Sequence, residues 1–450
     1  MSRPLRIGNG QGFWGDDVDA PVRLARSGSL DVLTLDYLAE VTMSVLARAK
    51  KRDPSAGYAA DFLDVVSGLA SMWRDGAGPV VIANAGGLNL PAAAAGCRAR
   101  LAGLTGFPIG TVGGDDLMPL LPRLLESGET LPNLETGRPV ADVADRLVAA
   151  NAYLGAGPVV EALAGGARLV VTGRVADPSL ALAPAVHHHG WAADDWNRLA
   201  GGTVAGHLIE CGTQVTGGIW TRWAELADPF DLGYPVVEVA ADGSCVVTKP
   251  PGTGGAVNLE TVREQLLYEI GDPRAYVSPD VVADFTSLAL ADDGPDRVRV
   301  AGATGRAATG FYKVSAAYHD GWTASGTLTI FGRGAAAKAR LAGEAVRRRL
   351  ARAGSEPQTL HVECLGTGAC VAGVLPEPDT REVVLRLTAA DPRREVVERF
   401  AKEIVPLVTT GPQGTTGYFA GRPSVREVTA FWPCLIRKDL VTPTVRVETV

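Results

Sequence analysis

The sequence lacks the patterns that mark secreted, membrane-spanning or metal-binding chains. Its six cysteines, at positions 97, 211, 245, 364, 370 and 434, form no C-x-x-C pair. No apolar run reaches the roughly 18 residues of a transmembrane helix, and the N-terminus has no apolar leader. Scattered cysteines in a chain of this size indicate reduced thiols. We therefore expect a soluble cytoplasmic protein that does not associate with membranes.

The sequence also lacks an excess of positive charge. Lys and Arg number 43 against 50 Asp and Glu, a formal net charge of −7. Nucleic acids and anionic membrane surfaces select basic faces, so we expect neither as a partner. The longest basic cluster, Arg347-Arg348-Arg349, fits the solvated face of a helix. A small-molecule ligand remains the most suitable partner.

The first two-thirds of the chain repeat one pattern of a short apolar strand, a glycine-rich loop and a helix. Such alternation predicts βαβ units and hence an α/β fold with a mostly parallel sheet covered by helices on both faces. The loops that follow parallel strands meet at the carboxyl edge of the sheet. The strands are expected at 5–9, 31–40, 79–84, 105–114 and 167–173.

The alternation changes twice, which predicts three parts. Residues 1–195 are expected to form the α/β domain, and 196–296, with glycine pairs at 201–202, 217–218 and 254–255, an irregular cap over the sheet edge. In residues 297–450 predicted strands follow one another directly, and two helices stand between these groups of strands. That order predicts an α+β domain similar to the split βαβ arrangement.

The stretch GNGQGFWGDD, residues 8–17, contains the outline G-x-G-x-x-G of a dinucleotide-binding turn. A strand precedes it, a helix follows, and Asp36 lies 21 residues after Gly15, near the place of a ribose-binding acid. Against this, Phe13 and Trp14 are bulky, and acids at 16, 17 and 19 occupy the first turn of the helix. Those acids would repel a pyrophosphate, so we expect helix capping or proton chemistry here instead.

A parallel sheet would gather polar residues from several loops at one edge. The stretch NAGGLN contains a glycine pair, Gly86 and Gly87, between Asn84 and Asn89. Free backbone N–H groups in such a turn can bind a carboxylate or polarise a thioester oxygen. The alternative is a tight turn with no ligand. The acids and amides expected at this edge are Asp16, Asp36, Glu40, Asn84, Asn89, Asp115, Asp116 and Asp177, together with Arg174.

Arg174 directly follows a predicted strand, and Asp177 stands three residues later. A guanidinium is the usual bidentate partner of a substrate carboxylate or phosphate, and a nearby carboxylate can fix its orientation. A purely structural Arg–Asp pair is the alternative. The neighbouring acids Asp115 and Asp116 are a candidate acid–base pair or one helix cap beside one solvated residue.

The order H-x-x-E-C places His207 and Glu210 on one face of a helix, with Cys211 next. This spacing allows a shared proton or a shared metal, but no third ligand stands at a diagnostic spacing, so no metal site is predicted. Cys211 is the best candidate thiol for proton transfer or nucleophilic attack, and an inert buried cysteine is the alternative. Lys313 either reaches an anionic substrate or lies on a solvent face.

Several motifs together resemble the acyclic terpene utilisation (AtuA) family. They occur in the order GFWGDD, DYLAEVTMSVLAR, NAGGLN, GRVADPSL, AGHLIECGTQVTGG, VREQLLYEIGDPRAYVSPDV, YKVS and GPQGTTGY. The resemblance extends from about residue 6 to about residue 440. It implies a role in degrading citronellol and geraniol through branched acyl-CoA intermediates.

These observations predict an enzyme acting on a small carboxylate or acyl thioester, with lyase- or hydratase-type proton transfer next to a carbonyl. Arg174 would bind the acidic group of the substrate, and the loop from Asn84 to Asn89 would bind the thioester oxygen. Cofactors stay open, since none is required and a divalent cation is conceivable. The alternatives are a non-catalytic acyl-binding subunit and a nucleotide-dependent enzyme; we also expect a homo-oligomer. The proposed acids and bases are Asp16, Asp36, Asp115, Glu210 and Cys211.

Overall fold

The computed structural model describes residues 3–27, 29–374, 376–417 and 421–450. Packing divides the chain into two compact units, Met1–Ala317 with Phe431–Val450, and Tyr318–Ala430. This division falls at other positions than the predicted domain boundaries. The reason is that β14 (Phe311–Phe331) begins in the first unit, where it pairs with β5 (Leu147–Ala152), and ends in the second. Each unit is described by itself.

The first unit contains a ten-stranded mixed sheet in the order β11-β12-β8-β7-β1-β2-β3-β6-β4-β19. The five strands β1, β2, β3, β6 and β4 are parallel, as predicted, and all remaining pairings are antiparallel. The expectation of a mostly parallel sheet was therefore wrong. The bounds are β1 Leu5–Asn9, β2 Val32–Leu35, β3 Val80–Ala83, β4 Pro108–Gly113, β6 Leu169–Thr172, β7 Val236–Val239, β8 Cys245–Thr248, β11 Ala289–Asp292, β12 Arg297–Ala301 and β19 Thr444–Thr449.

The antiparallel strands come from a stretch that was expected to be irregular. Within 196–296, β7 and β8 form a hairpin whose turn contains Gly243, with a φ of +86° that favours glycine. This hairpin adds to the free edge of β1, and β12 and β11 extend it. At the opposite edge β19, near the end of the chain, pairs with β4. Short hairpin strands have no helical connection, so the alternation of the earlier chain gives no sign of them.

One apolar core lies against a single face of the parallel strands. Strand residues two apart enter it from β2, β3 and β6, such as Leu33 and Leu35 from β2, because alternate side chains of a strand share a face. Phe62 and Leu69 from α3 complete it. The helices of this unit are α1 Ala20–Ser27, α2 Glu40–Arg52, α3 Phe62–Arg74, α4 Leu90–Arg100, α5 Leu121–Glu126, α6 Gly157–Ala164, α7 Ser179–His189, α8 Trp196–Glu210 and α9 Leu259–Leu267.

Helix α8 is buried on every side from Leu199 to Ile209. It packs against α7 and against a small sheet of β9 (Tyr276–Val277), β10 (Val281–Asp284) and β13 (Thr304–Ala307). A Cβ at Gly206 would lie 2.4 Å from the Pro178 carbonyl oxygen, and one at Gly201 would lie 2.2 Å from that of Gly243. Glycine therefore lets neighbouring backbones approach this helix closely.

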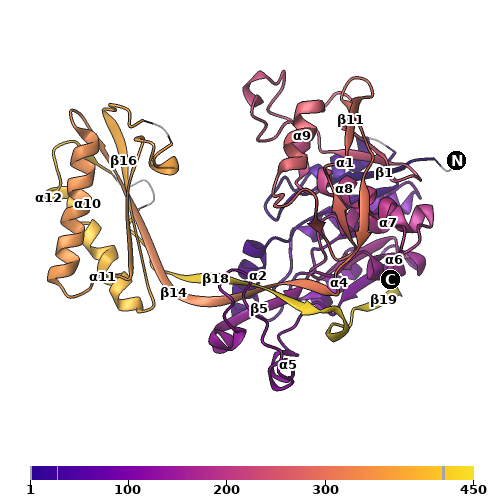
Figure 1. Ribbon diagram of the computed structural model, residues 1–450, viewed down its shortest axis with the longest axis horizontal. Helices are drawn as coiled ribbons and strands as arrows, with labels where there is room; N and C mark the ends of the chain where they lie inside the picture. Colours follow the sequence, from indigo (N-terminus) through magenta and orange to yellow (C-terminus); the bar gives the residue numbers. More distant parts are fainter. Residues whose placement is uncertain (1–2, 28, 375, 418–420) are drawn as a thin grey trace. The chain divides into compact units, whose positions relative to one another are not determined.

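The second unit is an antiparallel sheet with helices packed on one side. Strand β14 is central, next to β16 (Glu382–Asp391), and α10 (Ala335–Arg352) and α11 (Arg394–Ile404) lie on the same side of β16 (Figure 1). Its core contains Leu385 and Leu387 from β16 and Phe400 from α11. This agrees with the α+β composition predicted for the C-terminal part. The remaining elements of this unit are β15 Thr359–Leu365, α12 Leu407–Thr410, β17 Thr415–Thr416 and the 3-10 helix η5 Ala369–Val371. The other elements of the chain are β18 Arg426–Arg437 and the 3-10 helices η1 Val140–Asp142, η2 Ala144–Arg146, η3 Gly212–Thr216, η4 Trp223–Glu225 and η6 Lys438–Leu440.

The core of the first unit predicts a stability difference between two phenylalanines. Phe62→Ala should lower the free energy of unfolding by about 3–5 kcal/mol, because Phe62 is fully buried and its removal leaves a cavity. Phe230→Ala is the matched control, and it should change stability by less than about 0.5 kcal/mol since Phe230 is 91% exposed. Urea unfolding followed by circular dichroism measures both. Equal losses would contradict the assigned core.

Candidate functional site

Loops from neighbouring parallel strands are tied together at the carboxyl edge. Asp36 directly follows β2 and Asn84 directly follows β3, and both side chains are buried. The Asn84 Nδ2 group donates to Asp36 Oδ1 at 2.6 Å, and Asn84 Oδ1 accepts from the backbone N–H of Tyr37 at 2.6 Å. Protein partners thus occupy both ends of the Asn84 amide. The structure places this residue as a brace between loops.

Arg174 follows β6 after one glycine and is 2% exposed. Its backbone N–H donates to Asp115 Oδ2 at 2.8 Å, and Nη1 donates to Asp177 Oδ1 at 2.5 Å. Its guanidinium carbon lies 4.0 Å from the centre of the Tyr153 ring. Burial by itself lowers the pKa of Arg174, but Asp177, Tyr153 and Asp36 together raise it, so the guanidinium stays charged. No described residue accepts a hydrogen bond from Nη2.

Two cations contact the Tyr153 ring. Lys313 Nζ is 4.8 Å from the ring centre, in addition to the Arg174 guanidinium, and the Lys313 carbonyl accepts from the Tyr153 backbone N–H at 2.9 Å. Glu40, the first residue of α2, accepts from both the Tyr153 hydroxyl at 2.5 Å and Lys313 Nζ at 3.0 Å. Burial raises the pKa of Glu40, but Lys313 and Tyr153 outweigh it and lower the value to about 2. Glu40 is therefore an anion.

His207 and Glu210 share a proton at the end of α8. His207 Nδ1 lies 2.9 Å from Glu210 Oε1, and Nε2 lies 2.9 Å from the Gln265 carbonyl oxygen. A carbonyl only accepts, so Nε2 carries a hydrogen and the remaining proton lies between Nδ1 and Oε1. Burial raises the pKa of Glu210 to about 7 against the opposing effect of His207. For His207 burial lowers the pKa, but Glu210 raises it more.

Two buried amides fix the position of this pair. Asn9, the last residue of β1, donates from Nδ2 to the carbonyl oxygens of Ile209 at 2.6 Å and Glu210 at 3.1 Å. Gln265 Nε2 donates to the His207 carbonyl oxygen at 3.0 Å. Both amides bind carbonyls in the last turn of α8, which lack helical partners. The sheet edge and α9 thereby hold Glu210 in place.

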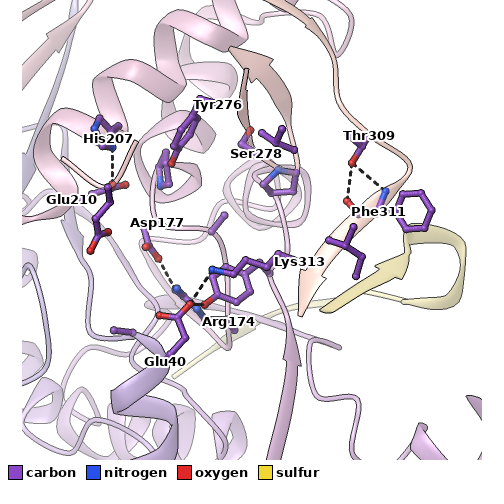
Figure 2. Close-up of a pocket in the computed structure, with 18 residues that line it drawn as sticks. Glu40, Arg174, Asp177, His207, Glu210, Tyr276, Ser278, Thr309, Phe311 and Lys313 are labelled. Carbon is purple, nitrogen blue, oxygen red and sulfur yellow. Dashed lines mark hydrogen bonds and ion pairs between the residues drawn. The ribbon is translucent and has the colours of Figure 1, made fainter. Parts of the chain in front are cut away.

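One cavity of about 580 Å³ is lined by Glu40, Tyr153, Arg174, Asp177, His207, Glu210 and Lys313. Figure 2 shows Arg174, Glu40 and Lys313 gathered at one end of the view and His207 with Glu210 at another, with Asp177 between them. The Tyr276 ring packs 5.7 Å from the His207 ring, and its hydroxyl has no hydrogen-bond partner among the described residues. The cavity therefore combines two ion pairs, one proton-sharing pair and a free phenol.

A second hollow of about 410 Å³ meets the first, and both are lined by Ala39, Asp177, Glu210 and Glu269. Asp16, Asp36 and Cys211 line only this second one. Burial and the charge of Asp177 raise the pKa of Asp36 well above its usual value, and Arg174 and Asn84 offset this only in part. Burial also raises the pKa of the Cys211 thiol far above its usual range. A protonated thiol is a poor nucleophile, so the geometry favours Cys211 as a bystander.

Several other residues predicted for the site line a separate hollow and bind protein groups. Asn89 and Gly87 line a separate hollow of about 520 Å³, together with Asp115. Asn89 caps α4 and donates to the carbonyls of Pro54 and Ala56, so its side chain serves the turn. Burial raises the pKa of Asp115 to about 6, but its Oδ2 binds the Arg174 backbone and Asn151. A Cβ at Gly86 would lie 2.6 Å from the Thr172 carbonyl oxygen, which explains the glycine by packing.

The opening glycine-rich loop packs against the protein itself. Asp16 Oδ2 accepts from the Gly12 backbone N–H at 3.1 Å, and its Oδ1 accepts from the Tyr234 hydroxyl. A Cβ at Gly12 would lie 2.7 Å from the Cys211 carbonyl carbon. The amide that would hold a phosphate is thus occupied by a carboxylate, and the glycine serves close packing against Cys211. This geometry supports the interpretation of the loop as neutralised by its own acids.

Sequence reasoning missed Tyr153, Tyr276, Glu269 and Asn9. The two tyrosines stand in short buried strands or beside them, where aromatic residues are expected as core, so no signal distinguishes them. Glu269 has a φ of +58°, a strained backbone for a residue with a side chain, and it lines both hollows. Asn9 ends a predicted strand beside glycine, which indicates a turn more readily than a brace.

Among the described residues, no group of three or more His, Cys, Asp or Glu is placed to hold a metal ion. In the same described part of the chain, no helix is both long and apolar enough to cross a bilayer.

The fold and site define an α/β protein with a charge-paired cavity at the carboxyl edge of parallel strands and a proton-sharing pair in its wall. The family is shown by sequence: residues 5–447 match the model of the acyclic terpene utilisation family protein AtuA, and the chain belongs to this family. The predicted resemblance is confirmed. The family is implicated in acyclic terpene utilisation, a catabolic role. No curated protein and no solved structure matches the chain.

The raised pKa of Glu210 predicts a pH-dependent stability difference between the wild type and Glu210→Gln. A carboxyl with a raised folded-state pKa stabilises the fold below about pH 4.5, and this contribution is lost as the pH rises through about 7. Between pH 5 and pH 8 the wild type should therefore lose about 3 kcal/mol relative to the glutamine variant. Urea unfolding at the two pH values measures this difference.

Glu161→Gln is the control, since it replaces an exposed glutamate of α6 outside the cavity. It should follow the wild type at both pH values. Parallel behaviour of the wild type and Glu210→Gln would show that Glu210 titrates normally.

Proposed function

We propose that the protein is a catabolic enzyme acting on a branched acyl compound, a carboxylate or a thioester, by lyase- or hydratase-type proton transfer next to the carbonyl. The observation that carries the proposal is the His207–Glu210 pair in the wall of a cavity that also contains a buried guanidinium. A base with a pKa near neutrality suits proton removal at physiological pH. The catabolic role of the family agrees with this chemistry.

The residues divide the chemistry between two ends of the cavity. Glu210, supported by His207, takes the proton from the carbon next to the carbonyl. Arg174 Nη2, which has no acceptor among the described residues, donates to the oxygen where negative charge develops. The Tyr276 hydroxyl is a further donor facing the same space. In proton exchange Glu210 returns the proton to the same carbon. In dehydration it passes the proton to the hydroxyl group that leaves the next carbon as water, and hydration is the reverse of this step, so the pair is restored in each case.

Arg174 replaces the two residues that were predicted to polarise the thioester oxygen. Asn84 and Asn89 were expected to polarise the thioester, but their amides are bound to protein groups. We therefore assign Arg174 as the hydrogen-bond donor to the carbonyl oxygen of the substrate. Asp16 binds the loop amide of Gly12 and the Tyr234 hydroxyl, which leaves Glu210 as the proposed base.

Glu210→Gln should lower kcat by about 100-fold or more, the usual contribution of general acid–base catalysis. The substrate is a 2-enoyl thioester of a branched acid. Hydration is measured by the loss of its conjugated absorbance, and proton exchange in D2O is measured by NMR. Glu161→Gln should keep the wild-type rate. Binding of the thioester with neither reaction in the wild type would instead support a non-catalytic acyl-binding subunit.

The proposed base also predicts the pH profile. Because Glu210 must lose its proton to act, kcat/KM should rise about tenfold per pH unit below pH 7 and level off above it. The measurement is kcat/KM of the wild type for proton exchange next to the carbonyl, the reaction in which Glu210 acts as the base, from pH 5.5 to pH 9. A flat profile, or the same rising limb in the residual activity of Glu210→Gln, would remove Glu210 from this role.

A further inference from the structure

The charges in the cavity of about 580 Å³ pair off completely. Its two lining cations each contact a carboxylate of the same cavity: Arg174 Nη1 lies 2.5 Å from Asp177 Oδ1, and Lys313 Nζ lies 3.0 Å from Glu40 Oε1. Among the described residues that line the cavity, no cation is left without a carboxylate. An incoming anion therefore finds no unpaired positive charge.

The remaining ionisable lining groups add no positive charge at alkaline pH. Above about pH 7 the His207–Glu210 pair holds one proton between Nδ1 and Oε1, so its net charge is zero in either arrangement. Glu269, which is exposed, adds one more carboxylate to the lining. A ligand carboxylate would thus find no unpaired cation in the cavity and would lie near the additional carboxylate of Glu269, which disfavours its ionised form.

Hydrogen-bond donors without a protein partner remain available in the same space. Arg174 Nη2 and the Tyr276 hydroxyl have no protein partner among the described residues, and both residues line the cavity. They can donate to a carbonyl oxygen without any change in the ion pairs. The charge distribution therefore matches a dipolar ligand group better than an anionic one.

Three exposed apolar side chains stand in the same lining. They are Val277 at the end of β9, Phe311 at the start of β14 and Leu435 in β18. Exposed apolar surface at a cavity is stabilised when an apolar group covers it. This surface provides contacts for an alkyl chain attached to the polar group of the ligand.

We infer that this cavity selects an uncharged acyl group that carries an alkyl chain, such as a thioester or an amide, and discriminates against the free carboxylate. The inference rests on the proposed function in taking this cavity as the acyl site, and it chooses between the two substrate classes that the proposal leaves open. It also changes the role of Arg174 from a partner of an acidic group to a donor for a neutral carbonyl.

The test compares a carboxylate with two uncharged ligands that carry the same alkyl chain. Binding of 3-methylbutanoate, of the isosteric 3-methylbutanamide, and of the N-acetylcysteamine thioester of the same acid is measured by isothermal titration calorimetry with the full chain at pH 8. The amide and the thioester should bind at least about tenfold more tightly than the carboxylate, because the carboxylate finds no unpaired cation and is repelled by the additional acid Glu269. Equal or tighter binding of the carboxylate, or no binding of the neutral ligands, overturns the inference.

Variants of the paired acids should remove most of this preference. Asp177→Asn leaves Arg174 without its carboxylate, so the affinity for 3-methylbutanoate should rise about tenfold while that for the amide changes less than about threefold. Glu40→Gln does the same for Lys313 and serves if the first variant does not fold. Glu161→Gln, which removes an equal charge outside the cavity, should leave all three affinities unchanged. An unchanged ratio of affinities in folded Asp177→Asn or Glu40→Gln overturns the inference.

The outcome is separate from that of the proposed function. Selective binding of the neutral ligands without hydration or proton exchange would refute the proposed enzyme and keep the selectivity. Turnover combined with preferred binding of the carboxylate would refute the selectivity and keep the enzyme.

Discussion

Arg174 is buried where the ends of several elements meet, and its contacts hold the cavity together. Its backbone binds Asp115 in the loop after β4, its guanidinium pairs with Asp177 before α7, and its planar group lies over Tyr153 after β5. A buried charge costs several kcal/mol unless its partners are in place, so the loops of Asp177 and Tyr153 are fixed by the need to satisfy one cation, and the backbone of the same residue holds Asp115. The same requirement leaves one guanidinium nitrogen for a ligand. Structure and proposed chemistry therefore depend on one buried ion pair.

The second constraint is the close packing of α8. Glycines at 201 and 206 let neighbouring backbones approach the helix, and this buries its last turn beside the sheet edge. Burial then raises the pKa of Glu210 toward neutrality, while Gln265 fixes which nitrogen of His207 carries hydrogen. A surface helix with the same H-x-x-E spacing would expose both groups to water, and the carboxyl would keep an ordinary pKa. The chemistry of the pair is a consequence of where the helix is packed.

Much of the fold was predictable, because it depends on local patterns. The parallel strands from β1 to β6 and the helices after them follow the period of the apolar residues, and α10 and α11 follow theirs. Strands β7, β8 and β11 were not predictable, since each is only four residues long and their partners are distant or joined by tight turns. Short strands gain their stability from pairing, which periodicity does not record.

For the site, the sequence by itself determined which kinds of groups are present and which of them follow strands: Arg174, Asp177 and Asp36 at the sheet edge, and Glu210 with His207 on one helical face. Only the tertiary structure decided what these groups do. It bound Asn84 to Asp36, paired every cation of the cavity with an acid, and brought in Tyr153. Charge pairing and burial depend on distances between residues far apart in the chain. A one-dimensional pattern contains the residues that can ionise, and folding sets the environment that decides whether they do.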